Sequence, residues 1–415
     1  MNRRWLVLSL VFLGILVSYI DRGNLSVAAE SIMHDLRLQP ATMGILLSAF
    51  FWTYALCQIP AGLLVDRFGV RGVYAVAFAL WSVASASVAL SRGPGDIIAA
   101  RLVLGFAETL APVASLAVIR ASFSPRENGV PTAIYMAGQT LGPAIGLLLG
   151  TTLLVQFGWR AMFAVTGLAA LLWVPGWLAV APRVEKTSER PRTNWLEILL
   201  APTLWAMAIS VLFFSYYWYF VLTWVPNYLT SARGYSTLGM GRILSAPLAC
   251  MAVTNILAGV CADRLLKTSV SLFRVRLWFA AAGLVGASSL LLLNVLPSNG
   301  LVMPVLLVSV CSFGIVSANF WTLAQNVAPP QKVGRVIGFL NTISQIGGIA
   351  APLITGRILG AAKHFPPAIA IAGICPLIAL VPLFITGRGI DRLRGRLHNE
   401  LRGVEPASAL DARNV

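Results

Sequence analysis

The stretch G-L-L-V-D-R-F-G-V-R, from Gly62 to Arg71, follows an apolar run and returns later in the chain in altered form. The second copy, G-V-C-A-D-R-L-L-K, runs from Gly259 to Lys267 and also follows an apolar run. Both copies share the core G-x-x-x-D-R, and each comes after the second long apolar segment of its half of the chain. A repeat at matching positions predicts an internal duplication, with two halves built alike.

The composition predicts a chain that lies in lipid. Of its 415 residues, 58% are hydrophobic and 11% are charged, with a mean hydropathy of +0.80. A soluble domain is usually about a quarter charged. A membrane-spanning helix needs about 20 mostly apolar residues. Twelve windows meet this need: 5–30, 42–64, 73–91, 96–119, 131–155, 161–181, 203–229, 237–261, 276–296, 301–324, 337–361 and 367–386.

The polar stretch 182–197 divides these windows into two sets of six. The sequence therefore predicts an all-α polytopic membrane protein, with twelve transmembrane helices in two pseudo-symmetric six-helix bundles. The predicted units are an N-terminal bundle at 1–181, a cytoplasmic linker at 182–202, a C-terminal bundle at 203–386 and a basic cytoplasmic tail at 387–415.

The charge predicts the orientation. The net charge of +16 would suggest nucleic acid in a soluble protein, but here the basic residues lie between apolar runs. With the N-terminus inside, 22 of the 31 Lys and Arg fall in cytoplasmic segments, so we expect both termini in the cytoplasm. The N-terminal apolar run has no small-residue cleavage site, which favours a retained first helix. The basic tail is expected to bind anionic lipid.

Other chemistry finds little support in the sequence. The five cysteines lie in or beside apolar runs, with no ligand spacing and no close pair, so no metal site and no disulfide is predicted. His34, His364 and His398 fall in predicted loops or the tail, which disfavours a histidine proton relay. No nucleotide-binding loop or nucleophile motif is present. We therefore expect no enzyme and no cofactor.

Several motifs resemble known families. The stretch Gly62–Arg71 resembles the signature of the major facilitator superfamily, and only Val70 departs, where a basic residue is usual. The stretches Y-I-D-R-G-N-L-S-V-A at Tyr19–Ala28, L-S-A-F-F-W-T-Y-A-L-C-Q-I-P-A-G at Leu47–Gly62 and R-L-V-L-G-F-A-E at Arg101–Glu108 resemble the anion:cation symporter family, whose bacterial members include galactonate, glucarate and hexuronate transporters. The resemblance implies two bundles that expose a central cavity alternately to each side of the membrane.

Four charges lie deep inside predicted spans, where charge is costly and usually functional: Asp21, Arg22, Arg101 and Glu108. Adjacent residues on a helix point about 100° apart, so Asp21 and Arg22 face different neighbours. We predict that Asp21 pairs with Arg101. Glu108 has no evident basic partner, and a buried carboxyl without one favours its neutral form, so we predict that it carries the proton.

Arg22 is predicted to bind the carboxylate of the substrate, since a guanidinium group suits a bidentate contact. Tyr19, Arg22 and Ser26 fall on one helix face and form the expected cavity stripe. The resemblance implies that Asp21 and Glu108 couple protons and that Arg22 contacts substrate. The alternative is that these charges only hold helices together.

Four further residues match substrate-contacting positions of the family: Tyr54, Gln139, Trp321 and Asn341. An interfacial aromatic belt is the competing interpretation for Tyr54, and an interhelical hydrogen bond is the alternative for the others. The repeated loops supply the predicted gate, which consists of Asp66, Arg67, Arg71, Asp263 and Arg264. Topology-setting charge is the alternative for Arg67 and Arg71.

These patterns together predict proton-coupled uptake of a small organic anion across a bacterial inner membrane by a monomer. No second basic residue is evident in the core of the second half, and one free arginine suits a monocarboxylate such as an aldonate or uronate. Two alternatives stay open. Glycines 138, 142 and 146 resemble the fifth-helix motif of drug antiporters, which favours an exporter or antiporter, and a membrane receptor could bind the anion without moving it.

Overall fold

The computed structural model describes residues 3–124, 127, 129–182, 201–265, 272–327 and 333–403, and its regular secondary structure in these ranges is helical throughout. Of the predicted linker at 182–202, residues 183–200 lie outside the described part, as do Lys267 and the last part of the predicted tail, 404–415. The side chains beyond residue 387 also lie outside it.

The first half of the chain contains the helices α1 Arg3–Val27, α2 Ala29–Asp35, α3 Pro40–Leu56, α4 Gln58–Phe68, α5 Val70–Ser87, η1 Val88–Leu90, α6 Pro94–Glu108, α7 Leu110–Ser122, α8 Gly129–Ala170 and α9 Trp173–Val180. The second half contains α11 Pro202–Thr223, α12 Val225–Asn227, η2 Tyr228–Ala232, α13 Thr237–Leu265, α14 Leu272–Ala287, η3 Ser288–Asn294, η4 Asn299–Leu301, α15 Val302–Val327, α16 Val333–Ala362 and α17 Pro366–Gly403.

Ten helical segments of the described chain are long and apolar enough to cross a membrane, and an eleventh span forms if the bent pair α3 and α4 counts as one. One of the ten, Val130–Val180, has 51 residues, more than twice what a bilayer needs. It turns at Gly158, whose φ of 80° only glycine adopts readily, so it comprises two spans. The spans of the described chain thus number twelve, as the sequence predicts.

The repeated signature loop lies at a tight turn between two spans. The second span is broken near Cys57, where α3 and the later part of the span bend by 57°. Gly69 then separates α4 from α5 with a φ of 83°, a left-handed conformation that favours glycine. The glycine of the signature is therefore required by the turn, and Asp66 and Arg67 lie in the last turn of α4.

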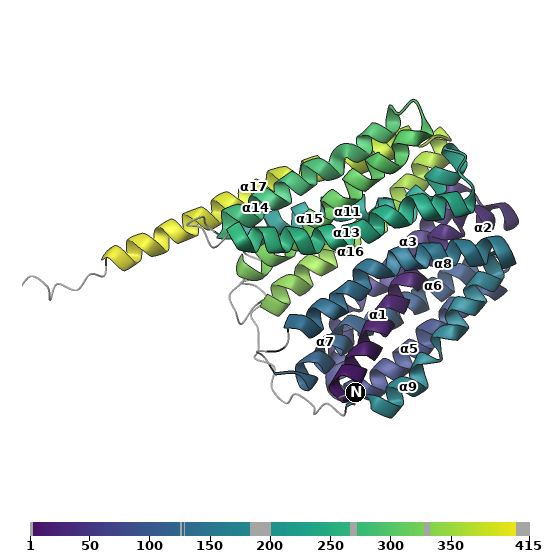
Figure 1. Cartoon of the computed structure of the whole chain (residues 1–415), viewed down its shortest axis with the longest axis horizontal. Coiled ribbons are helices and arrows are strands. Elements are labelled where there is room, and N and C mark those ends of the chain that lie inside the picture. The colour runs from purple at the N-terminus through teal and green to yellow at the C-terminus, as the bar shows by residue number, and fades with distance from the viewer. Residues whose placement is uncertain are drawn as a thin grey trace, which may run out of the picture.

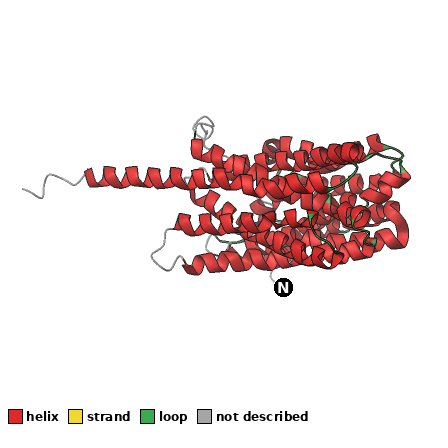
Figure 2. Ribbon diagram, turned by 90° about the horizontal axis from the view of Figure 1, so that it is seen from above, coloured by secondary structure: helices red, strands yellow, loops and turns green. Residues whose placement is uncertain are grey.

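The two halves of the chain form two neighbouring bundles. The first half, purple to blue in Figure 1, lies beside the second, green to yellow, and Figure 2 shows the same helices from above. The bundles meet chiefly along α3 with α16 and along α8 with α13. The two surfaces that pair across the interface therefore come from equivalent spans, the second and fifth of each half.

The bundles approach each other closely near α2. A Cβ atom added to Gly44 of α3 would lie 2.5 Å from the carbonyl oxygen of Pro352 in α16, so only glycine permits this contact. Ser26 of α1 adds a hydrogen bond from its hydroxyl to the carbonyl oxygen of Leu222 in α11, at 2.7 Å. The interface is thus closed at this end, which we call the α2 end.

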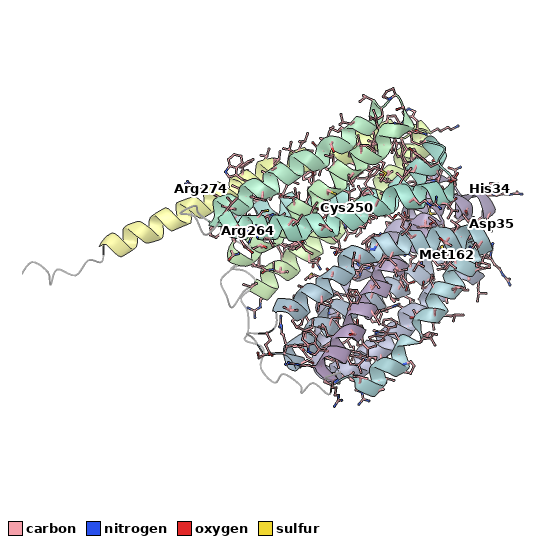
Figure 3. The ribbon with its side chains drawn as sticks, in the orientation of Figure 1. His34, Asp35, Met162, Cys250, Arg264 and Arg274 are labelled. Carbon is pink, nitrogen blue, oxygen red and sulfur yellow. The ribbon has the colours of Figure 1, made fainter. Side chains whose placement is uncertain are left out.

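The other end, which we call the terminal end, holds residue 3 and the turn at Gly69. Figure 1 shows the bundles diverging toward it. In Figure 3, His34 and Asp35 mark the α2 end of the first bundle, while Arg264 and Arg274 lie at the terminal end of the second. Asp35 is bound there by the guanidinium group of Arg160 and by the indole of Trp159, which lock α2 onto the sixth span.

Candidate functional site

A cavity of about 80 Å³ lies between the bundles and contains both arginines of the predicted site. Arg22 and Arg101 enter it from α1 and α6 of the first bundle. The other lining residues are Tyr19, Gly23, Ser26 and Val27 of α1, Phe51 of α3, Pro143 and Leu147 of α8, Trp218, Tyr219, Leu222 and Thr223 of α11, Pro226 of α12, and Leu244 and Leu248 of α13. The predicted stripe of Tyr19, Arg22 and Ser26 thus faces this cavity.

The central interaction of the site is an ion pair between Arg22 and Glu108. Arg22 Nε lies 2.6 Å from Glu108 Oε2, and the Glu108 side chain is wholly buried. The hydroxyl of Ser18, one helical turn before Arg22, donates a second hydrogen bond of 2.7 Å to the same oxygen. The other oxygen, Oε1, is buried without a partner. Glu108 therefore has the basic partner that the sequence did not reveal, and that part of the prediction is wrong.

Aromatic rings enclose the Arg22 guanidinium group. Its central carbon lies 4.5 Å from the ring centroid of Tyr19, 4.9 Å from that of Phe50 and 4.6 Å from that of Tyr54. Such contacts stabilise a cation that has lost its water. Tyr54 is 4% exposed and stacks on Phe50. Its position is in the core beside Arg22, so the interfacial-belt interpretation does not apply.

Arg101 lies nearby without an ion pair. Its guanidinium carbon is 5.2 Å from the same Phe50 ring that Arg22 contacts. Its side chain is almost fully buried, and in the described part of the chain it makes no hydrogen bond; its buried Nε has no partner. An unpaired buried cation in a cavity is suited to bind an anion.

The predicted pair between Asp21 and Arg101 is not formed. Asp21 Oδ1 instead accepts hydrogen bonds from Ser85 of α5 at 3.1 Å and from Asn24 at 3.4 Å. The physical reason is the angle between adjacent helical residues. Because Arg22 turns toward the cavity and α6, Asp21 is directed at α5. Ser85 could have been found only as a polar residue in an apolar span, which is a weak signal.

The remaining predicted substrate residues lie outside the lining of this cavity. Gln139 is partly buried and donates a hydrogen bond to the hydroxyl of Tyr135. Asn341 accepts one from Gln345, which in turn accepts one from Tyr219 of the cavity. Trp321 is partly buried and packs edge-on against Phe320. Asn341 thus reaches the cavity through a hydrogen-bonded chain, and the substrate roles of all three stay predictions.

The predicted gate residues lie at the terminal end of the bundles. Arg71 donates to the carbonyl oxygen of Leu178, and Trp177 donates to the carbonyl oxygen of Arg71, which ties α5 to α9. Arg67 lies over the ring of Phe68. In the second half, Asp263 is paired with Arg276, and Arg264 lies beside it in the last turn of α13. Their gating role stays a prediction.

Arg276 is the functional candidate that the sequence did not reveal. It is 5% exposed and binds both Asp263 of α13 and the side-chain oxygen of Asn319 in α15. Arg276 is nevertheless close to the end of its span, since its partner Asp263 is 67% exposed, so it does not place a basic residue in the core of the second half. Arg276 is the first residue of a predicted span, where the side chain of an arginine normally extends to the membrane interface. Only its hydrogen bond to Asn319 of α15, a contact between different helices, distinguishes it from such an interfacial arginine.

A second, larger cavity of about 450 Å³ lies at the α2 end. Ser26, Val27 and Pro226 line both cavities and separate them. Glu30 and His34 of α2 belong to the outer cavity alone. Within the described ranges, no group of three or more His, Cys, Asp or Glu residues is placed to hold a metal ion.

Twelve spans in two bundles around a buried, charged cavity define a membrane transporter of the two-bundle class. The family model described as Major Facilitator Superfamily matches residues 11–352, and the chain belongs to this superfamily. It is a multi-pass membrane transporter and not an enzyme.

Curated relatives match over nearly the whole chain. A probable galactarate/D-glucarate transporter of Escherichia coli K12 is 28% identical, over 93% of this chain and 95% of that protein. A D-galactonate transporter of Escherichia coli O6:H1 is 29% identical, over 93% and 96%. A hexuronate transporter of Bacillus subtilis is 27% identical, over 88% and 90%.

The fold also matches a solved structure. A bacterial homologue of the human lysosomal transporter Spinster, described as inward-facing and unoccupied, superimposes with a TM-score of 0.81 at 17% identity. The match covers 94% of this chain and 98% of that one. At this identity the likeness concerns the fold.

Proposed function

We propose that the protein takes up a small organic anion together with protons, by alternating access of the cavity between its bundles. The observation that carries the proposal is the buried pair of Arg22 and Glu108 beside the unpaired Arg101. Arg22 and Arg101 are two fixed cations that can bind the carboxylate of a substrate, and Glu108 is a carboxylate that can bind a proton. The relatives are named as sugar-acid transporters, which makes a sugar acid one candidate substrate.

The geometry supports a competition between proton and substrate. While Glu108 is charged, it occupies Arg22 through a bond of 2.6 Å. When Glu108 accepts a proton, its attraction for Arg22 falls, and the guanidinium group becomes available to a substrate carboxylate beside Arg101. Proton and anion then enter together, because each stabilises the site that the other needs. Loss of the proton restores the ion pair and releases the anion.

Asp21 is the second carboxyl of the proposed coupling system. It is 1% exposed, and its Oδ2 is buried without a hydrogen-bond partner. Its bond to Ser85 links proton occupancy to the contact between α1 and α5. Of the described histidines, His34 lies in the last turn of α2 (Figure 3) and His364 between α16 and α17, and neither lines the cavity that holds Arg22 and Arg101. Proton transfer is therefore assigned to the carboxylates of Asp21 and Glu108, and the nearby positive charge of Arg101 influences their protonation.

The charge distribution supports an orientation in a bacterial inner membrane, with both termini in the cytoplasm. The terminal end is then cytoplasmic, and the structure, closed at the α2 end, is inward-facing. The repeated loops with Asp66, Arg67, Arg71, Asp263 and Arg264 would brace the cytoplasmic ends of spans when the carrier faces outward. We propose that the chain acts as a monomer, with bundles at 1–181 and 203–386.

The test is uptake into proteoliposomes that contain the purified full-length chain. Labelled D-galactonate, D-gluconate, D-glucuronate and 4-hydroxybenzoate are offered with an inward proton gradient. We expect at least one of them to accumulate above equilibrium and to leak out when a protonophore collapses the gradient. Protein-free liposomes correct for passive entry. If no acid accumulates under a gradient of either direction, symport is the wrong mechanism.

Two other functions would give different results. An exporter or antiporter is favoured by the close packing at Gly138, Gly142 and Gly146, where an added Cβ would collide with α1. Such packing also serves plain helix contact. Counterflow stimulated only by an outward-directed exchange gradient would identify an antiporter. Binding without any flux would identify a receptor.

A further inference from the structure

We infer that the anion selected by the cavity is an aromatic monocarboxylate, with a charged end at Arg22 and Arg101 and a flat apolar body, rather than a polyhydroxylated acid. The inference rests on the proposed function, because it takes this cavity as the substrate site. It differs from the substrates for which the relatives are named, and these relatives share under 30% of their residues with this chain. The cavity lining, rather than that likeness, carries it.

The cavity walls away from the two arginines are largely apolar. Phe51 and Leu147 belong to the first bundle, and Trp218, Leu222, Leu244 and Leu248 to the second. Trp218 stacks on Phe313 with ring centroids 4.8 Å apart and an angle of 5°, which holds the indole in one orientation. Rigid aromatic and leucine side chains of this kind bind a flat apolar ring, which gains from leaving water.

Three of the four hydroxyl groups of the lining already donate a hydrogen bond to the protein, and the fourth, on Tyr19, belongs to the charged end, where its ring contacts Arg22. Ser26 donates to the carbonyl oxygens of Leu222 and Thr223. Thr223 donates to the carbonyl oxygen of Tyr219, at 2.6 Å, and Tyr219 donates to Gln345. A hydroxyl has only one hydrogen to donate. Each of these groups can therefore only accept a further bond, and a sugar acid would bury hydroxyls with too few partners.

Two positions that match substrate-contacting residues of the family also make hydrogen bonds within the protein. The amide of Gln139 donates to Tyr135, and the side-chain oxygen of Asn341 accepts from Gln345. Neither residue lines this cavity. By contrast, Arg22 Nη2 and Arg101 Nε are buried without partners. The unmet hydrogen-bonding capacity of the site is concentrated at its charged end, which matches a ligand with one carboxylate and little other polarity.

The test measures binding to the purified full-length chain in lipid nanodiscs by calorimetry, with three monoanions: benzoate, D-gluconate and acetate. All three carry one carboxylate, so they differ in the body alone. We expect benzoate to bind at least tenfold more tightly than either of the others. D-gluconate binding as tightly as benzoate, or more tightly, overturns the inference. So does equal binding of benzoate and acetate, because the apolar walls would then contribute nothing.

Variants of a cavity-lining leucine and of an exposed leucine on the same helix test whether the cavity wall binds benzoate. Leu147 lines the cavity, while its neighbour Leu148 is 44% exposed on the outer face of α8. We expect Leu147→Ala to weaken benzoate binding at least threefold and to leave acetate binding unchanged, whereas Leu148→Ala changes neither. If Leu147→Ala does not fold, Leu248→Ala on α13 makes the same measurement, with the 55% exposed Leu257 as its control. Equal effects of cavity and outer-face variants would contradict the inference.

The inference and the proposed function can fail separately. Selective benzoate binding with no proton-driven accumulation of any acid would support an aromatic ligand in the cavity and contradict proton symport. Proton-driven accumulation of D-gluconate, with tighter binding of D-gluconate than of benzoate, would support symport and contradict the selectivity for an aromatic acid.

Discussion

Arg22 and Glu108 form a buried ion pair of 2.6 Å between the first and fourth spans, while Arg101, seven residues before Glu108 on α6, has no ion pair or hydrogen bond within the described part of the chain. Residues seven apart on a helix share a face and lie about 10 Å apart along its axis. Glu108 can therefore neutralise Arg22 without reaching Arg101. Both arginines contact the Phe50 ring and line the same cavity, so we expect a ligand in that cavity to meet both.

Replacing Glu108 by Gln removes the group that competes with substrate for Arg22. We expect Glu108→Gln to bind the anion at least as tightly as the parent, with a weaker dependence of binding on pH. Proton-driven accumulation in proteoliposomes should fall at least tenfold, because the variant cannot carry the proton. Retained accumulation, with binding unchanged, would show that Glu108 has no part in coupling.

The two arginines should differ in what their loss does to stability. Arg22→Gln leaves Glu108 buried without a cation, and breaking a buried pair costs about 3–5 kcal/mol. We expect its melting temperature to drop, and the double variant Arg22→Gln with Glu108→Gln to recover most of it. Non-additive stability of this kind is measured by a double-mutant cycle. Purely additive losses would mean that the two groups do not stabilise each other.

Arg101→Gln orphans no ion-pair partner, so its melting temperature should stay close to that of the parent. Its affinity for a carboxylate should nonetheless fall at least tenfold, because a fixed cation is lost from the cavity. Binding is measured by calorimetry, with Arg120→Gln at the terminal end of α7 as the matched control. Unchanged affinity in Arg101→Gln would place the anion site elsewhere.

The fold could be predicted because its signals are local. Length, apolar windows and the repeated G-x-x-x-D-R core depend on the chain alone, and they indicated the twelve spans and the break near Gly158. The pairing of charges could not be predicted in this way. Whether Asp21 or Arg22 faces α6 depends on the rotation of α1 about its axis, and a rotation of about 100° exchanges them.

The contacts among Arg276, Asp263 and Asn319 in the second half could not be predicted from the sequence either. Arg276 lies close to the predicted end of a span, where reaching for the interface is the ordinary behaviour of an arginine. Its burial arises because Asp263 and Asn319, from two other helices, converge on it. Such convergence is a property of tertiary packing, and no spacing along the sequence encodes it.

At the α2 end, Asp35→Asn should destabilise the protein in a pH-dependent way. The bond from Arg160, with a second from Trp159, holds the pKa of the Asp35 carboxyl below its ordinary value. A lowered pKa in the folded state stabilises the fold above the unfolded pKa of about 3.9, and this contribution is lost as the pH falls through the folded value.

The Asp35 side chain is well exposed, so the effect is small, a few degrees in melting temperature or less at pH 7. We expect the difference between parent and Asp35→Asn to shrink steadily below about pH 4. Melting curves in detergent between pH 3 and pH 7 measure it. A difference that grows on acidification would contradict the assigned ion pair.

The closure of the α2 end depends on Gly44. An added Cβ there would lie 2.5 Å from the Pro352 carbonyl oxygen, and neither backbone can move away without parting α3 from α16. We therefore expect Gly44→Ala to shift the population toward states open at the α2 end. Opening would break the hydrogen bonds of Ser26 to α11 and expose the segment around Val225–Asn227 to water. Hydrogen exchange should rise there by at least tenfold.

Gly72→Ala, where an added Cβ meets nothing within 4 Å, is the matched control and should leave exchange unchanged. If Gly44→Ala protects this segment as well as the parent does, the close approach of α3 and α16 does not hold this end shut.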